Sequence, residues 1–182
     1  SELQHMADLF IQTASAASAR MPQALFLAPL ATRETRAMFE TALYRNNAEG
    51  LPLTVLFGHA QEAMSAADAV LVASGTATLE AALLGKPMVI TYKMPAASYW
   101  LLKGKGYLPY YGLPNILAGE FVVPEILQDD ATPGTLAQAL LNLLGDDPVR
   151  ARIERKFAAL SASLARGASR QAALAILPML QA

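Results

Sequence analysis

The chain has 182 residues, 54% of them hydrophobic, which is long enough for one well-packed α/β domain with a sizeable core. Its 14 lysine and arginine residues nearly balance its 15 aspartate and glutamate residues, so the charge pattern excludes the basic field that nucleic-acid binders need. Because the chain lacks cysteine, it has no disulfide framework, thiolate metal site or cysteine nucleophile, and its composition fits a reducing compartment.

Helical and strand patterns alternate through the first half of the chain. Apolar residues at helical spacing predict a first helix that starts near Leu3 and fades near Arg20. Residues 24–28 form a wholly apolar run, and such strands belong in a sheet that is covered on both faces. The patterns that follow predict helix 32–47 with Thr32 or Thr35 as its cap, strand 53–57, helix 61–67, strand 69–72, helix 76–84 and strand 88–92. This alternation, with short connections, predicts an α/β fold built on a Rossmann-like doubly wound parallel sheet.

The pattern changes after residue 92. Residues 95–114 are rich in tyrosine and glycine, which predicts a short helix followed by an irregular, functional loop. The aromatic and basic residues around Trp100 suit a membrane interface, although packing against the sheet explains them as well. Helices are predicted over 135–144, 147–165 and 169–180, so that residues from about 145 onward close the domain with helices.

The sequence contains neither a membrane span nor a signal peptide. No apolar run reaches the roughly 20 residues that cross a bilayer, and the N-terminus lacks a basic segment followed by an apolar one. A soluble cytoplasmic protein is the simplest interpretation. The chain begins at Ser1 without an initiator methionine, so we expect either a fragment of a longer protein or a processed chain.

The turn that joins strand 69–72 to the next helix is the strongest candidate for a binding site. In an open parallel sheet it lies at the carboxyl end of a strand, where backbone N–H groups and the positive end of a helix can hold phosphate. Ser74, Gly75 and Thr76 form this turn, and Glu80 follows one helical turn later, where it would reach sugar hydroxyls. Simple helix capping by Ser74 or Thr76 explains the same residues equally well.

Several familiar motifs are absent from the sequence. It has no Gly-x-Gly-x-x-Gly fingerprint, and Lys86 is followed by Pro87 at a helix end, which excludes a P-loop. His5 and His59 are far apart in sequence, so we expect no zinc site and interpret both as surface or packing residues. Ser74 lacks the Gly-x-Ser-x-Gly elbow of a serine nucleophile.

Two further polar positions are candidates. The amide of Asn115, after Tyr110 and Pro114, can both donate and accept hydrogen bonds, but a β-turn in which Asn115 bonds its own backbone fits equally well. Glu125 and Gln128 are three residues apart, so on a helix they would share a face. A first-turn acid is the simpler interpretation of Glu125.

In order and spacing, segments of this chain resemble the lipid A disaccharide synthase family. The segment at 68–80 alone would indicate only the wider GT-B glycosyltransferases, which use nucleotide sugars. The segments at 113–119 (Leu-Pro-Asn-Ile-Leu-Ala-Gly) and 124–128 (Pro-Glu-Ile-Leu-Gln) make the resemblance specific. The Gly-Lys-Pro-Met-Val segment at 85–89 lies between them at the matching distance.

This resemblance implies one half of a GT-B fold, in which two Rossmann-like domains face a cleft. Residues 1–182 would be the C-terminal, UDP-sugar-binding domain, and the N-terminal acceptor domain is absent from this chain. The implied reaction transfers 2,3-diacylglucosamine from UDP-2,3-diacylglucosamine to 2,3-diacylglucosamine 1-phosphate in lipid A biosynthesis, with inversion and release of UDP. The family also implies no metal or other cofactor and a peripheral place at the cytoplasmic face of a Gram-negative inner membrane. A homo-oligomer is compatible with these residues.

The resemblance carries binding roles to particular residues. The implied partners are the pyrophosphate for Ser74, Gly75 and Thr76, the ribose for Glu80, the sugar-phosphate side for Asn115 and Gln128, and the uracil for Phe57 and Gly58. This sequence has Gly112 where the family often has serine, which removes a hydroxyl contact. An inverting transfer needs a catalytic base. We assign none in this chain, because the carboxylates in these segments suit donor binding instead. We expect the base in the missing domain.

Two alternatives stay open at this point. The same fold also serves other UDP-sugar transferases and UDP-N-acetylglucosamine epimerases, which a preference for acylated donors would distinguish. A non-catalytic nucleotide-sugar or interaction module is the other alternative, because no base can be assigned in this chain.

Overall fold

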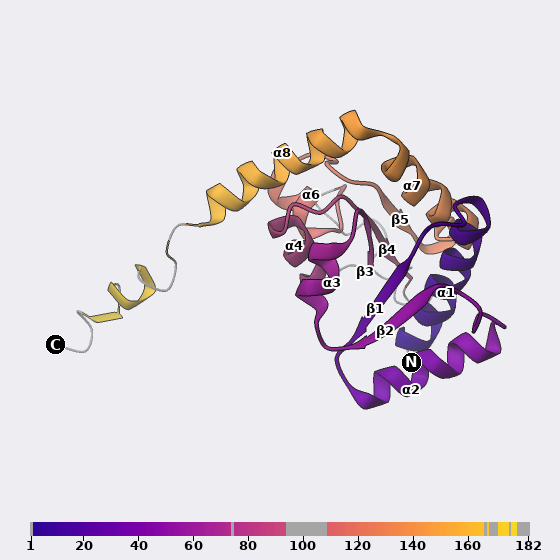
Figure 1. Ribbon diagram of the computed structural model, residues 1–182. Coiled ribbons are helices and arrows are strands. Elements are labelled where there is room, and N and C mark those ends of the chain that lie inside the picture. Colours follow the sequence, from indigo (N-terminus) through magenta and orange to yellow (C-terminus); the bar gives the residue numbers. More distant parts are fainter. Residues whose placement is uncertain are drawn as a thin grey trace.

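The computed structural model describes residues 2–73, 75–93, 109–165, 167, 171–174 and 176–177 (Figure 1). Helices and strands alternate along these residues, which confirms the α/β fold class. In chain order they are α1 (Glu2–Arg20), β1 (Phe26–Leu30), α2 (Arg33–Arg45), β2 (Leu53–Phe57), α3 (Ala60–Ala66), β3 (Val70–Ala73), α4 (Thr76–Leu83), β4 (Met88–Tyr92), α6 (Leu113–Ala118), β5 (Glu125–Leu127), the 3-10 helix η1 (Gln128–Asp130), α7 (Pro133–Gly145) and α8 (Asp147–Leu164).

The strands pair in parallel, in two groups. β1 lies beside β2, while β4 lies between β3 and β5. Within the described ranges no strand pairing joins the two groups, and Figure 1 shows β1 and β2 as a pair set apart from the other strands. The parallel topology predicted from the sequence is confirmed, although the sheet is divided between β1 and β3.

Helices cover both sides of the three-stranded group. On one side α7 packs against β4 and against α1, which also contacts α2. On the other side α4 contacts β3, α6 and α8. Figure 1 shows β3 and β4 between these two sets of helices. Because both faces are covered, β4 is buried throughout its apolar part, as expected for a central parallel strand.

The hydrophobic core has two parts that match the two groups of strands. The larger part contains Met88, Val89 and Ile90 of β4, each 0% exposed, together with residues of α4, α7 and α8. The smaller part is built from α1, α2 and the inner side of β1 and β2, and includes Ile11 and Phe39. Residues of α1 take part in both.

The expectation that strand 24–28 is covered on both faces is wrong for the described part of the chain. Leu27 of β1 is 43% exposed, and Leu25 just before the strand is 81% exposed. Both α2 and α3 contact β1, but they leave Leu27 exposed, so the side of the strand that carries Leu27 is not fully covered by the described residues. Phe57, at the end of the neighbouring strand β2, is also exposed.

Hydroxyl and carboxylate side chains define where several helices begin. Thr32 caps α2 in a capping box with Thr35, whose backbone N–H it accepts. The hydroxyl of Thr132 caps α7 by accepting the backbone N–H of Thr135, so this helix begins at Pro133 rather than at the predicted residue 135. Asp146 caps α8.

The chain leaves the body of the molecule along α8. Ile153 and Phe157 of this helix are buried, whereas its last residues are exposed. In Figure 1 the helical residues 171–174 and 176–177 lie beyond the end of α8, away from the rest of the structure. The remainder of the predicted helix 169–180 lies outside the described residues. Among the described helices, none is both long and apolar enough to cross a membrane.

Candidate functional site

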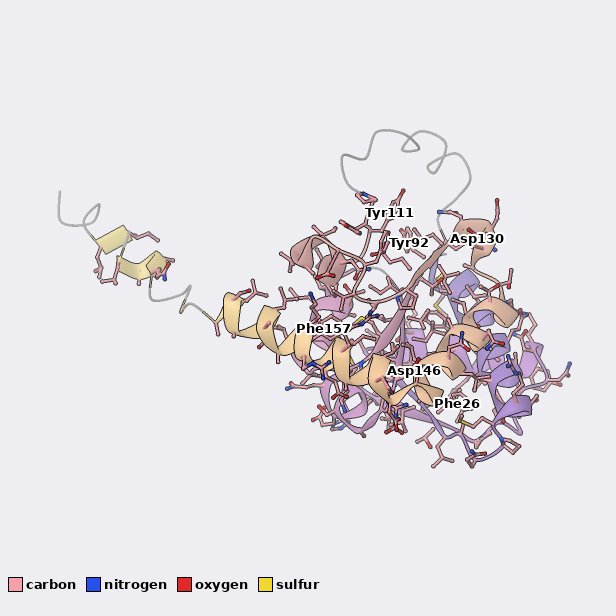
Figure 2. The ribbon with its side chains drawn as sticks, turned by 90° about the horizontal axis from the view of Figure 1, so that it is seen from above. Phe26, Tyr92, Tyr111, Asp130, Asp146 and Phe157 are labelled. Atoms are coloured by element: carbon pink, nitrogen blue, oxygen red, sulfur yellow. The ribbon has the colours of Figure 1, made fainter. Side chains whose placement is uncertain are left out.

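The carboxyl ends of the parallel strands define the edge of the molecule where a ligand is expected. Figure 2 shows Tyr92, which ends β4, and Asp130, which follows β5, on one edge, together with Tyr111. Phe26, which begins β1, lies on the opposite side. Most of the residues predicted to bind the donor follow strand ends at the first of these edges.

The described part of the β3–α4 turn has one residue, Gly75, with an uncommon backbone conformation. Ser74 lies outside the described residues. Gly75 has φ +143° and ψ −165°, a conformation that side-chain-bearing residues rarely adopt, so glycine is required there. The carbonyl of Gly75 accepts the N–H and the hydroxyl of Thr78, at 3.2 and 2.7 Å. Thr76 is the first residue of α4 and not its cap, so capping does not explain why a threonine stands there.

Glu80 lies on the solvent side of α4. It is exposed, and within the described ranges its carboxylate forms no hydrogen bond or ion pair. Because residues four apart lie on the same face of a helix, Glu80 and Thr76 share a face. Its carboxylate is thus available to a ligand whose phosphate lies at the start of the helix.

The β2–α3 turn has an uncommon backbone. Gly58 has φ +73° and His59 has φ +55°, so two successive residues adopt left-handed conformations, which is uncommon for a residue other than glycine. His59 is exposed, as predicted, and its Nδ1 lies 3.4 Å from a carboxylate oxygen of Glu62. A hydrogen bond from its own backbone, with a smaller contribution from His59, lowers the pKa of Glu62 below its usual range.

No metal centre is formed by the described residues, in which no three histidine or acidic side chains gather. The side chain of His5 lies outside what the structure describes. The loop and short helix predicted at 95–114, including Trp100, also lie outside it up to residue 108.

Asn115 is fully buried in α6, and its amide bonds a different segment of the chain. Its Oδ1 accepts the N–H groups of Val122 and Val123, at 2.9 and 3.1 Å. Its Nδ2 donates to the carbonyl of Val123 at 2.9 Å and to Glu125 Oε1 at 2.8 Å. The β-turn interpretation, in which Asn115 bonds its own backbone, is therefore wrong. Its oxygen accepts two hydrogen bonds and its nitrogen donates two, all within the protein.

Glu125 accepts hydrogen bonds from the backbone that enters α6. Its Oε2 accepts the N–H of Tyr111 at 2.8 Å, and its Oε1 accepts the N–H of Gly112 at 2.9 Å as well as the Asn115 amide. Glu125 begins a strand, β5, whose three residues pair with β4, so the interpretation as a helical first-turn acid is wrong. A strand this short shows no readable alternation in the sequence.

The chain matches known proteins along most of its length. A sequence model of the family described as lipid-A-disaccharide synthetase matches residues 1–176. The chain belongs to this family. It is 52% identical over 181 residues to a lipid-A-disaccharide synthase of Methylobacillus flagellatus, covering 100% of this chain and 48% of that protein. The synthase of Azoarcus sp. is 56% identical, over 99% of this chain and 46% of that protein. This chain thus spans about half the length of the curated relatives it matches.

Gln128, the remaining candidate residue, directly follows β5. It has φ +52° and opens the 3-10 helix η1, so it does not continue a helix from Glu125 as expected. A residue other than glycine in the left-handed conformation raises the free energy of the folded chain locally. Such residues cluster at functional sites.

The structure therefore places the predicted residues in two settings. Gly58, Gly75, Thr76 and Gln128 follow the ends of β2, β3 and β5, with Phe57 ending β2 and Glu80 one turn into α4. Asn115, in contrast, is buried beneath this edge. The sequence did not reveal the role of Glu125, although Glu125 and Asn115 belong to neighbouring segments of the same family pattern. It also gives no sign of the left-handed backbone of His59.

Proposed function

We propose that this chain is the donor-binding part of a lipid-A-disaccharide synthase, a glycosyltransferase of lipid A biosynthesis. The observation that carries the proposal is the family match over residues 1–176, together with relatives that bear this name. It is supported by candidate binding residues that follow the carboxyl ends of several strands, where open α/β sheets bind nucleotides.

The proposed donor is UDP-2,3-diacylglucosamine. Its pyrophosphate would lie against Ser74, Gly75 and Thr76, because the first amides of a helix have no acceptor within the helix. The exposed carboxylate of Glu80 would accept hydrogen bonds from the ribose, and the Phe57–Gly58 turn would lie near the uracil. Gln128 would lie on the sugar-phosphate side, with Asn115 behind it. In this proposal backbone dipoles stabilise the pyrophosphate, and no metal or other cofactor takes part.

The proposed reaction transfers the diacylglucosamine unit to 2,3-diacylglucosamine 1-phosphate with inversion, and UDP leaves. A base must remove the acceptor hydroxyl proton as the new bond forms. We place that base in the half of the relatives' length that this chain does not match. The acylated substrates would bring the whole enzyme to the cytoplasmic face of the inner membrane. We therefore expect UDP binding by this chain but no transfer, and turnover by it alone would contradict the assignment of the base.

Removing the Glu80 carboxylate is expected to weaken UDP binding. Glu80→Ala should raise the dissociation constant for UDP roughly tenfold, because hydrogen bonds to a charged group contribute about 1.5–3 kcal/mol each. Calorimetric titration of the wild-type chain with UDP, ADP and GDP, and of the variant with UDP, measures this. We also expect UDP to bind more tightly than either purine nucleotide.

Glu154→Ala is the matched control for this experiment. Glu154 is an exposed helical acid on α8, and it lines a hollow with Lys86, just before β4, so it lies at the opposite edge of the sheet. Its removal should leave UDP binding unchanged. Equal binding of the three nucleotides, or a Glu80→Ala variant that binds UDP as tightly as wild type, would count against the donor site. Equal affinity for UDP-N-acetylglucosamine and the acylated donor would favour a different UDP-sugar enzyme.

A further inference from the structure

Glu125 acts on the backbone of a neighbouring segment. Both of its carboxylate oxygens are engaged, by the N–H groups of Tyr111 and Gly112 and by the Asn115 amide. We propose that Glu125 is a positioning residue of the donor site, which sets the affinity for the nucleotide by holding the Tyr111–Gly112 backbone at the carboxyl edge of the sheet. This inference rests on the proposed UDP-sugar site.

The electrostatics of α6 explain why a carboxylate suits this position. Gly112 is the N-cap of α6 and has no side chain to bond the first amides of the helix. An anion near the N-terminus of a helix is stabilised by the helix dipole and by unpaired N–H groups. Glu125 supplies that anion from another strand. Its hydrogen bonds to Tyr111 and Gly112 thereby connect β5 to the start of α6.

Other contacts join the same two segments. The hydroxyl of Tyr110 donates to the carbonyl of Gly119 at 2.8 Å, and its ring packs edge-on against Phe121 with centroids 4.7 Å apart. Asn115 holds the backbone of residues 122–123, just before β5. Residues 110–115 and 119–125 are thus cross-linked into one unit, and Glu125 contributes its charged contacts.

This unit lies at the edge where the ligand is proposed. Gly112 is close enough to Ile90 of β4 that an added Cβ would overlap Cδ1 of Ile90, and β4 ends two residues later at Tyr92. Figure 2 shows Tyr111 and Tyr92 on the same edge as Asp130. The side chain of Tyr111 is 54% exposed. The hydrogen bonds of Glu125 therefore hold the backbone of Tyr111 and Gly112 beside the strand ends.

The test compares UDP binding by Glu125→Gln and by the wild-type chain. The amide keeps the shape of the side chain, but it replaces one acceptor oxygen with an NH₂ group that faces backbone donors. We expect the dissociation constant for UDP to rise about tenfold, since small displacements of binding groups have effects of this size. The backbone amide resonances of Tyr111 and Gly112 should move in the NMR spectrum, because their hydrogen-bond acceptor has lost its charge.

Two control variants separate positioning from a general loss of stability. Glu120→Gln makes the same chemical change on the same α6–β5 connection, but Glu120 forms an exposed ion pair with Lys156. Ile11→Val removes one methylene from a buried residue of α1 and lowers stability, and the smaller core to which Ile11 belongs contains no residue of the segment 110–125. Both should bind UDP within twofold of wild type. Their thermal midpoints, measured beside that of Glu125→Gln, show that each variant is folded.

The outcomes are distinguishable. If UDP binds and Glu80→Ala weakens it, but a folded Glu125→Gln variant binds UDP as tightly as wild type, the role of Glu125 is wrong and the donor site stands. A loss of affinity by Ile11→Val equal to that of Glu125→Gln would also overturn the positioning role. If wild type does not bind UDP, both proposals fail. Should Glu125→Gln not fold, the wild-type amides of Tyr111 and Gly112 decide: they should shift on saturation with UDP, and unchanged resonances would overturn the inference.

Discussion

Replacing Asn115 with alanine is expected to lower the free energy of unfolding by about 3–5 kcal/mol. The side chain is 0% exposed and makes hydrogen bonds with the backbone of Val122 and Val123 and with Glu125. Truncation would leave these donors and acceptors without partners in a buried position, and each such group costs about 1–3 kcal/mol. Asn115→Asp should also destabilise the chain, because its second oxygen would face the carbonyl of Val123 and the carboxylate of Glu125.

Urea denaturation and thermal unfolding measure this effect. For a chain of this length the midpoint of thermal unfolding should fall by roughly 10 °C. Asn142→Ala is the matched control, because Asn142 is an exposed asparagine whose hydrogen bond to Gln138 lies on the surface of α7. That variant should stay within about 0.5 kcal/mol of wild type. A loss of less than 1 kcal/mol for Asn115→Ala would contradict the importance we give to its hydrogen bonds.

Adding a methyl group at Gly112 is expected to cost about 2–3 kcal/mol. Gly112 has φ −79°, so its backbone conformation tolerates any residue. The obstacle is packing, because a Cβ there would overlap Cδ1 of Ile90 and lie 3.1 Å from Oε1 of Glu125. Ile90 is 0% exposed at the centre of the larger core, where it has little room to turn aside.

A second substitution tests this explanation. Ile90→Val removes the overlapping Cδ1 atom and should by itself cost about 0.5–1.5 kcal/mol. In that background Gly112→Ala should cost at most half of what it costs in wild type, so the double-mutant cycle should give a clear coupling energy. Urea unfolding of the four proteins measures it. Strict additivity would mean that the contact with Ile90 is not what excludes a side chain at Gly112.

The same contact gives a physical reason for a departure noted in the sequence. Where the family often has serine, this chain has Gly112, and from the sequence the expected consequence was a lost hydroxyl contact. In the structure the glycine is matched to the long side chain of Ile90 across from it. We therefore expect serine at this position to require a smaller residue at position 90.

The sequence predicted the fold well where the patterns were long. Each element up to Tyr92 was predicted within a few residues, because wholly apolar strands alternate there with helices that have recognisable ends. The prediction was wrong for β5, since three residues show no period and their position depends on pairing with β4. It also missed the division of the sheet, because the apolar run in β1 reads the same whether one face is covered or both.

The candidate site was predictable only as a set of residue types. The glycine of the β3–α4 turn indicated an uncommon backbone, and its φ of +143° confirms that indication. The direction of the Asn115 amide could not be predicted, because an amide that donates and accepts suits a ligand, its own backbone or another segment equally well. The structure chooses the third, through contacts with residues that follow it by seven to ten positions.

The division of the core has a consequence for the dynamics of the domain. The small cluster that includes Ile11 and Phe39 supports β1, β2 and α2 with few large buried side chains, so we expect this part to open locally at a lower free energy than the rest. Gly58 belongs to this weaker unit, whereas Gly75 and Gln128 belong to the stronger one. A nucleotide that contacts all three residues would bind only the closed form, and it would slow amide hydrogen exchange in β1 and β2 more than in β4.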